Sequence, residues 1–159
     1  MYSLNESLAF LLNRTGSAIA TAFSTELKNL DLTMPMWRVL AALWSNGDQS
    51  LNSLSDLTSV ELSTLSRQVA SLVKDGLASR NKSAVDWRAI NIGLTAKGRQ
   101  VVEQLLPVVE RHERVAFNGV SAADARKFRQ LLNKVHGNIV ASDEALLIEL
   151  DSTGAPIDT

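Results

Sequence analysis

The apolar residues of this chain recur every three or four positions along almost its whole length, and this helical spacing changes only between residues 78 and 94. There apolar and polar residues alternate instead, as Ile90, Ile92 and Leu94 do with Asn91 and Gly93, which indicates a β-hairpin. The sequence therefore predicts a mainly α protein with a small β-hairpin. We expect strands over 78–82 and 89–94, and helices over 4–28, 35–46, 53–58, 62–75, 96–115 and 121–139.

Small polar residues mark the starts of three of these helices. Ser53 with Asp56, and Ser121 with Asp124, have the spacing of a capping box, in which the first side chain accepts a backbone N–H three residues later. Thr95 stands directly before the long helix and is expected to cap it.

The composition excludes several classes of protein. The sequence has no Cys and two His, His112 and His136, which rules out disulfides, thiolate zinc sites and cysteine nucleophiles. It contains no glycine-rich phosphate loop, H-E-x-x-H or G-x-S-x-G motif, so we expect neither an enzyme nor a bound cofactor or metal. No apolar run is long enough to span a membrane, and the N-terminus lacks the basic start of a secretory signal, so we expect a cytoplasmic protein.

Charge is distributed unevenly, although the net charge is only −1. Residues 1–60 carry a net charge of −2, residues 61–99 of +4, residues 100–135 of +2, and the last 24 residues of −5. A basic centre between acidic ends suits local contact with a polyanion. An ordinary solvated surface is the alternative that charge alone leaves open.

The order of elements around the hairpin is typical of a winged helix-turn-helix, in which one helix enters the DNA major groove and the hairpin reaches the neighbouring backbone. The candidate recognition helix is 62–75, and no carboxylate lies on its polar face between Glu61 and Asp75. Arg67 can form a fork with guanine, and Gln68 can bridge an adenine edge. An amphipathic surface helix with a serine-rich outer face is the alternative. The polar face consists of Ser63, Thr64, Arg67, Gln68, Ser71 and Lys74.

Two runs of sequence resemble the multiple antibiotic resistance regulator (MarR) family of bacterial transcription factors: ELSTLSRQVASLVKDGLASR at 61–80 and DWRAINIGLTAKG at 86–98. The resemblance extends over nearly the whole chain. It implies an obligate homodimer with interlocked N- and C-terminal helices. This dimer would bind palindromic duplex DNA and repress transcription until a small aromatic or phenolic anion binds to the protein. The corresponding layout is a dimerisation helix at 1–30, a winged helix-turn-helix region at 34–98, a long helix and a C-terminal dimerisation helix at 99–150, and a flexible acidic tail at 151–159.

The resemblance also assigns roles to single residues. By position, Ser63, Thr64, Ser66 and Arg67 match the groove-reading segment of the family, Arg88 matches its wing arginine, and Asp86 matches the acidic residue that orients that arginine. The sequence departs from the family pattern at Trp87, where a second basic residue is common. This departure weakens the expected electrostatics of the wing, for which Arg80 and Lys82 can compensate.

A dimer is expected from the residues as well. The first and last helices lie outside the winged module, yet each carries a long apolar stripe, and burial stabilises such surface by roughly 25 cal/mol per Å². On a monomer the same stripes would form an unusually large exposed patch. A two-fold dimer would place two recognition helices about 34 Å apart, one turn of DNA. One larger helical core in a monomer is the alternative.

Five residues are candidates for binding a small organic effector. Arg38 follows Trp37 near a helix start, where a guanidinium and an indole can hold a carboxylate; the alternative is a core tryptophan beside a salt-bridging arginine. His112 and Arg14 can bind the same anion or lie solvated on their helices. Met34 can shape an adaptable apolar pocket or fill the core.

The function that the sequence predicts is a ligand-responsive, DNA-binding repressor. A helical dimer that binds a protein or a ligand without productive DNA binding is the alternative, and Trp87 and the near-neutral net charge support it.

Overall fold

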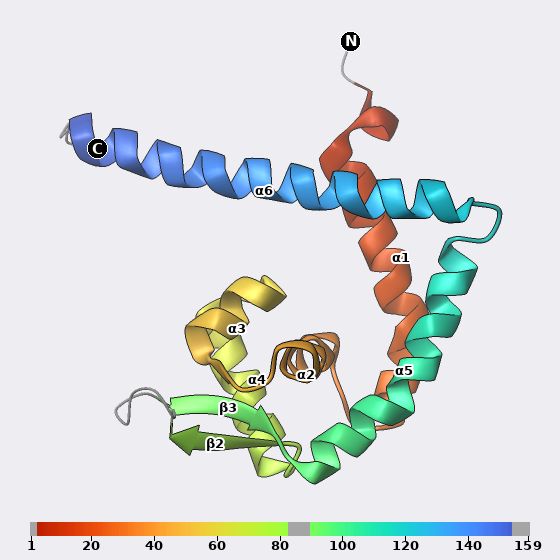
Figure 1. The fold of residues 1–159 in the computed structure, drawn as a ribbon, viewed down its shortest axis with the longest axis vertical. Coiled ribbons are helices and arrows are strands. Elements are labelled where there is room, and N and C mark those ends of the chain that lie inside the picture. The colour runs from red at the N-terminus through yellow and green to blue at the C-terminus, as the bar shows by residue number, and fades with distance from the viewer. Residues whose placement is uncertain (1–2, 83–89, 154–159) are drawn as a thin grey trace. The chain divides into compact units, whose positions relative to one another are not determined.

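A computed structural model of the chain describes residues 3–82 and 90–153. The chain divides into two compact units, residues 1–116 and 117–159. In the first unit, helices and a small antiparallel sheet surround one apolar core (Figure 1). Its elements are η1 (Leu4–Glu6), α1 (Leu8–Lys28), α2 (Met34–Asn46), β1 (Gln49–Ser50), α3 (Leu51–Thr58), α4 (Leu62–Lys74), β2 (Ala78–Lys82), β3 (Ile90–Leu94) and α5 (Ala96–Ala116).

The core explains which face each helix turns outward. Leu65, Val69 and Leu72 of α4 have no exposed surface, and neither have Val39 and Leu40 of α2. Leu65, Val69 and Leu72 recur at the three- and four-residue spacing seen in the sequence, which places them on one side of α4. The opposite side of α4 therefore faces away from the core.

The sheet contains one strand more than the sequence predicts. The two predicted strands pair antiparallel, from Ala78 opposite Leu94 to Lys82 opposite Ile90. The short strand β1 pairs with the other edge of β3, and the strand order is β1-β3-β2. The prediction of a two-stranded hairpin was therefore incomplete, because two residues are too few to show an alternating pattern.

The start of α3 also differs from the prediction. Ser50, not Ser53, is the cap: its Oγ accepts the backbone N–H of Ser53 at 3.1 Å. Ser53 lies inside the first turn, and its hydroxyl donates to Oε1 of Gln49 at 2.7 Å. The capping box expected at Ser53 and Asp56 is wrong. Ser50 takes its place because the helix begins at Leu51, two residues before the predicted start.

The second unit contains α6 (Ala122–Thr153). The backbone N–H of Asp124 donates to Oγ of Ser121 at 3.1 Å, which confirms the predicted start of this helix. The ring of Phe117 lies edge-on to that of Phe128 at 6.1 Å. The helix continues through Thr153, so the first three residues of the expected tail are helical, and residues 154–159 lie outside the described part of the chain.

Candidate nucleic-acid interface

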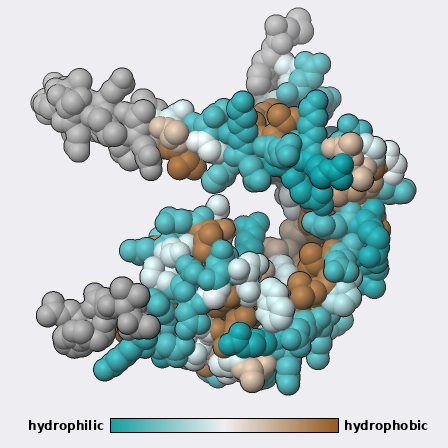
Figure 2. Space-filling model, in the orientation of Figure 1, coloured by the Kyte–Doolittle hydropathy of each residue, from teal (hydrophilic) through white to brown (hydrophobic). Residues whose placement is uncertain are grey.

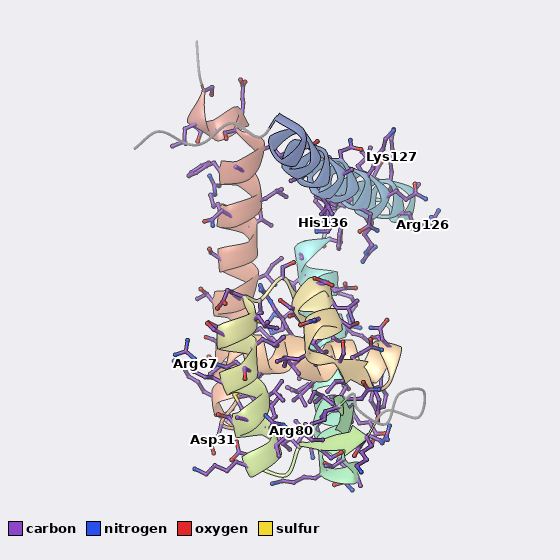
Figure 3. All side chains as sticks on the ribbon, turned by 90° about the vertical axis from the view of Figure 1, so that its left-hand side faces the viewer. Asp31, Arg67, Arg80, Arg126, Lys127 and His136 are labelled. Carbon is purple, nitrogen blue, oxygen red and sulfur yellow. The ribbon has the colours of Figure 1, made fainter. Side chains whose placement is uncertain are left out.

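The outward side of α4 carries a stripe of exposed polar residues. Ser63, Arg67, Ser71 and Lys74 are three or four positions apart and are all exposed, so they lie along one side of the helix. Arg67 projects from α4 away from the rest of the first unit (Figure 3), with its Nε 3.4 Å from the carbonyl oxygen of Ser63. Thr64 and Ser66, also predicted for DNA contact, are half-buried and flank the stripe. We call Ser63, Arg67, Ser71 and Lys74 the α4 stripe.

Glu61 fixes the N-terminal end of the α4 stripe. Its carboxylate accepts the backbone N–H of Ser63 at 2.9 Å and of Thr64 at 3.2 Å, and the Ser63 hydroxyl donates to it as well. These donors, the Ser63 hydroxyl above all, hold the pKa of Glu61 below its usual value. The Ser63 hydroxyl is thus already committed to Glu61, a contact that sequence reasoning missed because Glu is not among the common capping residues.

Gln68 is tied to the start of α2. The Thr33 hydroxyl accepts the backbone N–H of Met36 at 3.3 Å and donates to Oε1 of Gln68 at 3.2 Å. Gln68 is half-buried and lies beside the α4 stripe. Oε1 of Gln68 therefore already accepts one hydrogen bond, and the NH₂ group of the same amide is a donor.

The sheet adds two exposed cations, Arg80 and Lys82, both on β2. An acidic residue from the α2–β1 turn holds this strand: Oδ2 of Asp48 accepts the side-chain N–H of Asn81 at 2.9 Å. The Asp48 carboxylate lies so close to Gly93 that a Cβ built there would come within 2.3 Å of Oδ1. Gly93 therefore leaves room for Asp48, and the contact of Asp48 with Asn81 ties the α2–β1 turn to the hairpin.

A cavity of about 350 Å³ opens between α2 and α3. Two of the predicted effector residues, Trp37 and Arg38, line it together with Ala41, Ala42, Ser45, Asn46, Leu57 and Thr58. An indole, a guanidinium and small side chains thus surround a space at the lower end of the size range of ligand pockets.

The family model of the transcriptional regulators SarA/Rot matches residues 21–105. Among curated proteins, the HTH-type transcriptional repressor IacR of Pseudomonas putida is 31% identical over 113 residues, which cover 71% of this chain and 68% of that protein. The chain belongs to the MarR family of winged helix-turn-helix transcriptional regulators.

Solved structures agree with this assignment. A MarR-family regulator from Silicibacter pomeroyi superposes with a TM-score of 0.78 and 30% identity, over 86% of this chain and 92% of that chain. BpsR of Bordetella bronchiseptica, whose DNA binding is regulated by 6-hydroxynicotinic acid, superposes with a TM-score of 0.73 and 26% identity, over 82% of this chain and 99% of that one. The family and these relatives are regulators of transcription rather than enzymes.

Other predicted site residues of this MarR-family chain lie elsewhere or outside the described residues. Asp86, Trp87 and Arg88 fall within 83–89, which the structure does not describe. Arg14 is exposed on α1, and Met34 is half-buried against the core. Neither residue lines the cavity between α2 and α3.

His112 also lies away from the cavity lining, in a contact between α5 and α1. Its Nε2 lies 3.4 Å from Oε1 of Glu26, which also accepts from Nη2 of Arg111 at 3.2 Å. Phe23 lies edge-on both to His112, at 5.7 Å, and to Trp37, at 5.5 Å. The ring of Phe23 therefore connects His112 to Trp37 in the cavity wall.

Two features are absent from the part of the chain that the structure describes. Within residues 3–82 and 90–153, no helix is both long and apolar enough to cross a membrane. The same part of the chain contains no cluster of three or more His, Cys, Asp or Glu side chains suited to a metal ion.

Proposed function

We propose that two copies of this chain bind a palindromic duplex in the cytoplasm as a repressor, with the α4 stripe in the major groove, and that a small aromatic acid releases them. The observation that carries the proposal is the α4 stripe itself. It presents Arg67, Ser71 and Lys74 beyond the carboxylate of Glu61, which engages Ser63 at its N-terminal end, and it stands opposite a fully buried apolar face.

The charges around the stripe support contact with DNA. Arg67 can donate two parallel hydrogen bonds to a guanine edge, whereas Lys74 suits a phosphate. Arg80 and Lys82 on β2 are exposed cations that can reach the adjoining backbone as a wing does. Contacts to bases specify a sequence and contacts to the backbone position the protein on the duplex, and these two sets of residues suit the two tasks.

Exposed apolar side chains support a dimer. On α1, Leu8, Leu11, Leu12 and Ile19 are 40–50% exposed and share one face, and Leu4 on η1 is 52% exposed. On α6, Phe128, Leu131 and Ile139 are 47–55% exposed. Apolar surface is visible over both helices (Figure 2), and a second copy of the chain is the occupant we propose for it.

The cavity between α2 and α3 is the site we propose for the effector. Arg38 can bind a carboxylate, and Trp37 can pack on an aromatic ring. A volume of about 350 Å³ suits a molecule with a single ring. The relative BpsR, regulated by 6-hydroxynicotinic acid, supports this class of ligand, and the relative IacR, named as a repressor, supports the direction of control.

The test begins with selection of duplexes from a random library by the full chain. Fluorescence anisotropy then compares the wild type, Arg67→Ala and the control Arg126→Ala, which removes the same charge from α6. We expect Arg67→Ala to weaken binding roughly 5- to 150-fold and to relax base preference, as expected for a base-reading arginine, while Arg126→Ala changes little. Failure to select any sequence would favour the alternative, a helical dimer without productive DNA binding. Equal affinities of the wild type and Arg67→Ala would contradict the role of the α4 stripe.

A further inference from the structure

The C-terminal end of α4 leaves a row of carbonyl groups outside the helix. Gly76 has a φ of +71°, its N–H donates to the carbonyl of Val73 at 3.1 Å, and the N–H of Leu77 donates to that of Leu72 at 2.8 Å. These two bonds form a Schellman motif, which ends the helix abruptly. The carbonyls of Asp75, Gly76 and Leu77 are then available to another element.

The start of α5 binds all three carbonyls. Nζ of Lys97 donates to the carbonyl of Asp75 at 2.8 Å, and Oγ1 of Thr95 donates to that of Gly76 at 2.7 Å. The backbone N–H of Thr95 donates to the carbonyl of Leu77 at 3.2 Å. We call these three contacts the α4–α5 joint.

Thr95 serves both helices with one hydroxyl. While Oγ1 donates to Gly76 at the end of α4, it also accepts the backbone N–H of Gly98 at 3.0 Å as the cap of α5. The start of α5 presses closely on the turn that follows α4, because a Cβ built on Gly98 would lie 2.0 Å from the carbonyl oxygen of Leu77. Rotation of α4 against α5 would therefore distort the bonds from Thr95 to Gly76 and from Lys97 to Asp75.

The joint differs in kind from the other attachments of α4. The helix packs on the core through Leu65, Val69 and Leu72, and apolar contact depends little on direction. Hydrogen bonds weaken steeply when their angles change. Three of them at one end of α4 hold the direction of the helix, not only its position.

We propose that the α4–α5 joint sets how strictly the protein discriminates the spacing between the two half-sites of its operator, with Thr95 and Lys97 as positioning residues. The inference rests on the proposed function, in which two copies of α4 contact one duplex. α5 packs along α1, where Arg111 meets Glu26 at 3.2 Å, and α1 carries the apolar stripe assigned to the second copy. The joint thus links the recognition helix to the elements that hold the dimer.

The consequence follows from the geometry of DNA. One inserted base pair moves the second half-site about 3.4 Å along the duplex and about 34° around it. A dimer with firm joints cannot place both α4 helices correctly on the altered duplex, whereas a dimer with loosened joints can turn each helix to fit.

The experiment measures anisotropy with the selected duplex, the same duplex with one base pair inserted between its half-sites, and a single half-site. For the wild type we expect the insertion to weaken binding at least about tenfold, the scale of one mismatched base pair. The ratio to compare is the Kd for the duplex with the insertion divided by the Kd for the selected duplex. We expect Thr95→Val and Lys97→Met to reduce this ratio to less than about threefold, while half-site affinity stays within about twofold of the wild type. The controls Thr95→Ser and Lys97→Arg, which keep the donors, should keep the ratio of the wild type.

The outcomes separate the two proposals. If folded Thr95→Val and Lys97→Met keep the ratio of the wild type, the joint does not set spacing and the inference is overturned. If the wild type itself binds both duplexes equally, the two-fold mode of binding is wrong and the inference is overturned with it. Should Thr95→Val not fold, the pair Lys97→Met and Lys97→Arg decides alone.

Discussion

Replacing Gly98 by Ala should destabilise the protein, although it removes a glycine from a helix. Helix propensity alone predicts a gain of up to about 1 kcal/mol. The new Cβ would lie 2.0 Å from the carbonyl oxygen of Leu77 and 3.2 Å from Cδ2 of Leu94. Since that carbonyl is backbone held in the α4–α5 joint, relief requires the start of α5 to move away from the turn after α4, and overpacking of this kind costs about 3 kcal/mol. The clash outweighs the propensity, and we expect a net loss of about 2 kcal/mol.

The assay is thermal or urea unfolding at one fixed protein concentration, because the midpoint of a dimer depends on concentration. A loss of about 2 kcal/mol lowers Tm by roughly 4–8 °C for a chain of this size. Gly16→Ala in α1 is the matched control: no atom lies within 4 Å of its new Cβ, so the same exchange should raise stability by about 1 kcal/mol. Equal stabilisation by Gly98→Ala and Gly16→Ala would refute the close approach of α5 to Leu77.

Three further predictions concern the interface and the cavity. A panel of aromatic carboxylates is first screened for the ligand that most raises the Tm of the wild type. Arg38→Met should abolish this rise in Tm, and Arg38→Lys should keep part of it. An undiminished rise in Tm for Arg38→Met would exclude the guanidinium from the site. Glu61→Gln should lower stability at neutral pH. Because the pKa of Glu61 is depressed from its usual value of 4.5, the difference in stability between the wild type and this variant should shrink as the pH falls below 4.5 and vanish below the folded pKa. A difference in stability that is independent of pH would show that the charge of Glu61 contributes nothing. Thr33→Val should relax base preference at the position that Gln68→Ala also relaxes, whereas Thr33→Ser should not; unaltered preference in Thr33→Val would separate Thr33 from base reading.

Much of the fold was predictable because it depends on local sequence. The apolar spacing of α4 and the alternation of β3 are properties of short segments, and the structure confirms both. The starts of α5 at Thr95 and of α6 at Ser121 were predictable for the same reason, since each cap bonds within its own first turn.

The missed features depend on contacts between distant segments. Asp48 meets Asn81 and Gly93 across the sheet, and Thr33 meets Gln68 between two helices. The sequence shows Lys97 as one more cation of the basic centre, yet its ammonium group binds a backbone carbonyl at the end of α4. Residue type indicates what such a side chain can donate, and only the packed fold determines to which acceptor.

Contact between the α4 stripe and DNA is tested most directly by thiol protection. The chain contains no cysteine, so Ser71→Cys introduces a single thiol on the stripe, and Ser17→Cys places one on an exposed position of α1. We predict that the selected duplex greatly slows alkylation of the Ser71→Cys variant and leaves that of the Ser17→Cys variant unchanged. Alkylation of the Ser71→Cys variant at the same rate with and without bound duplex would contradict the account.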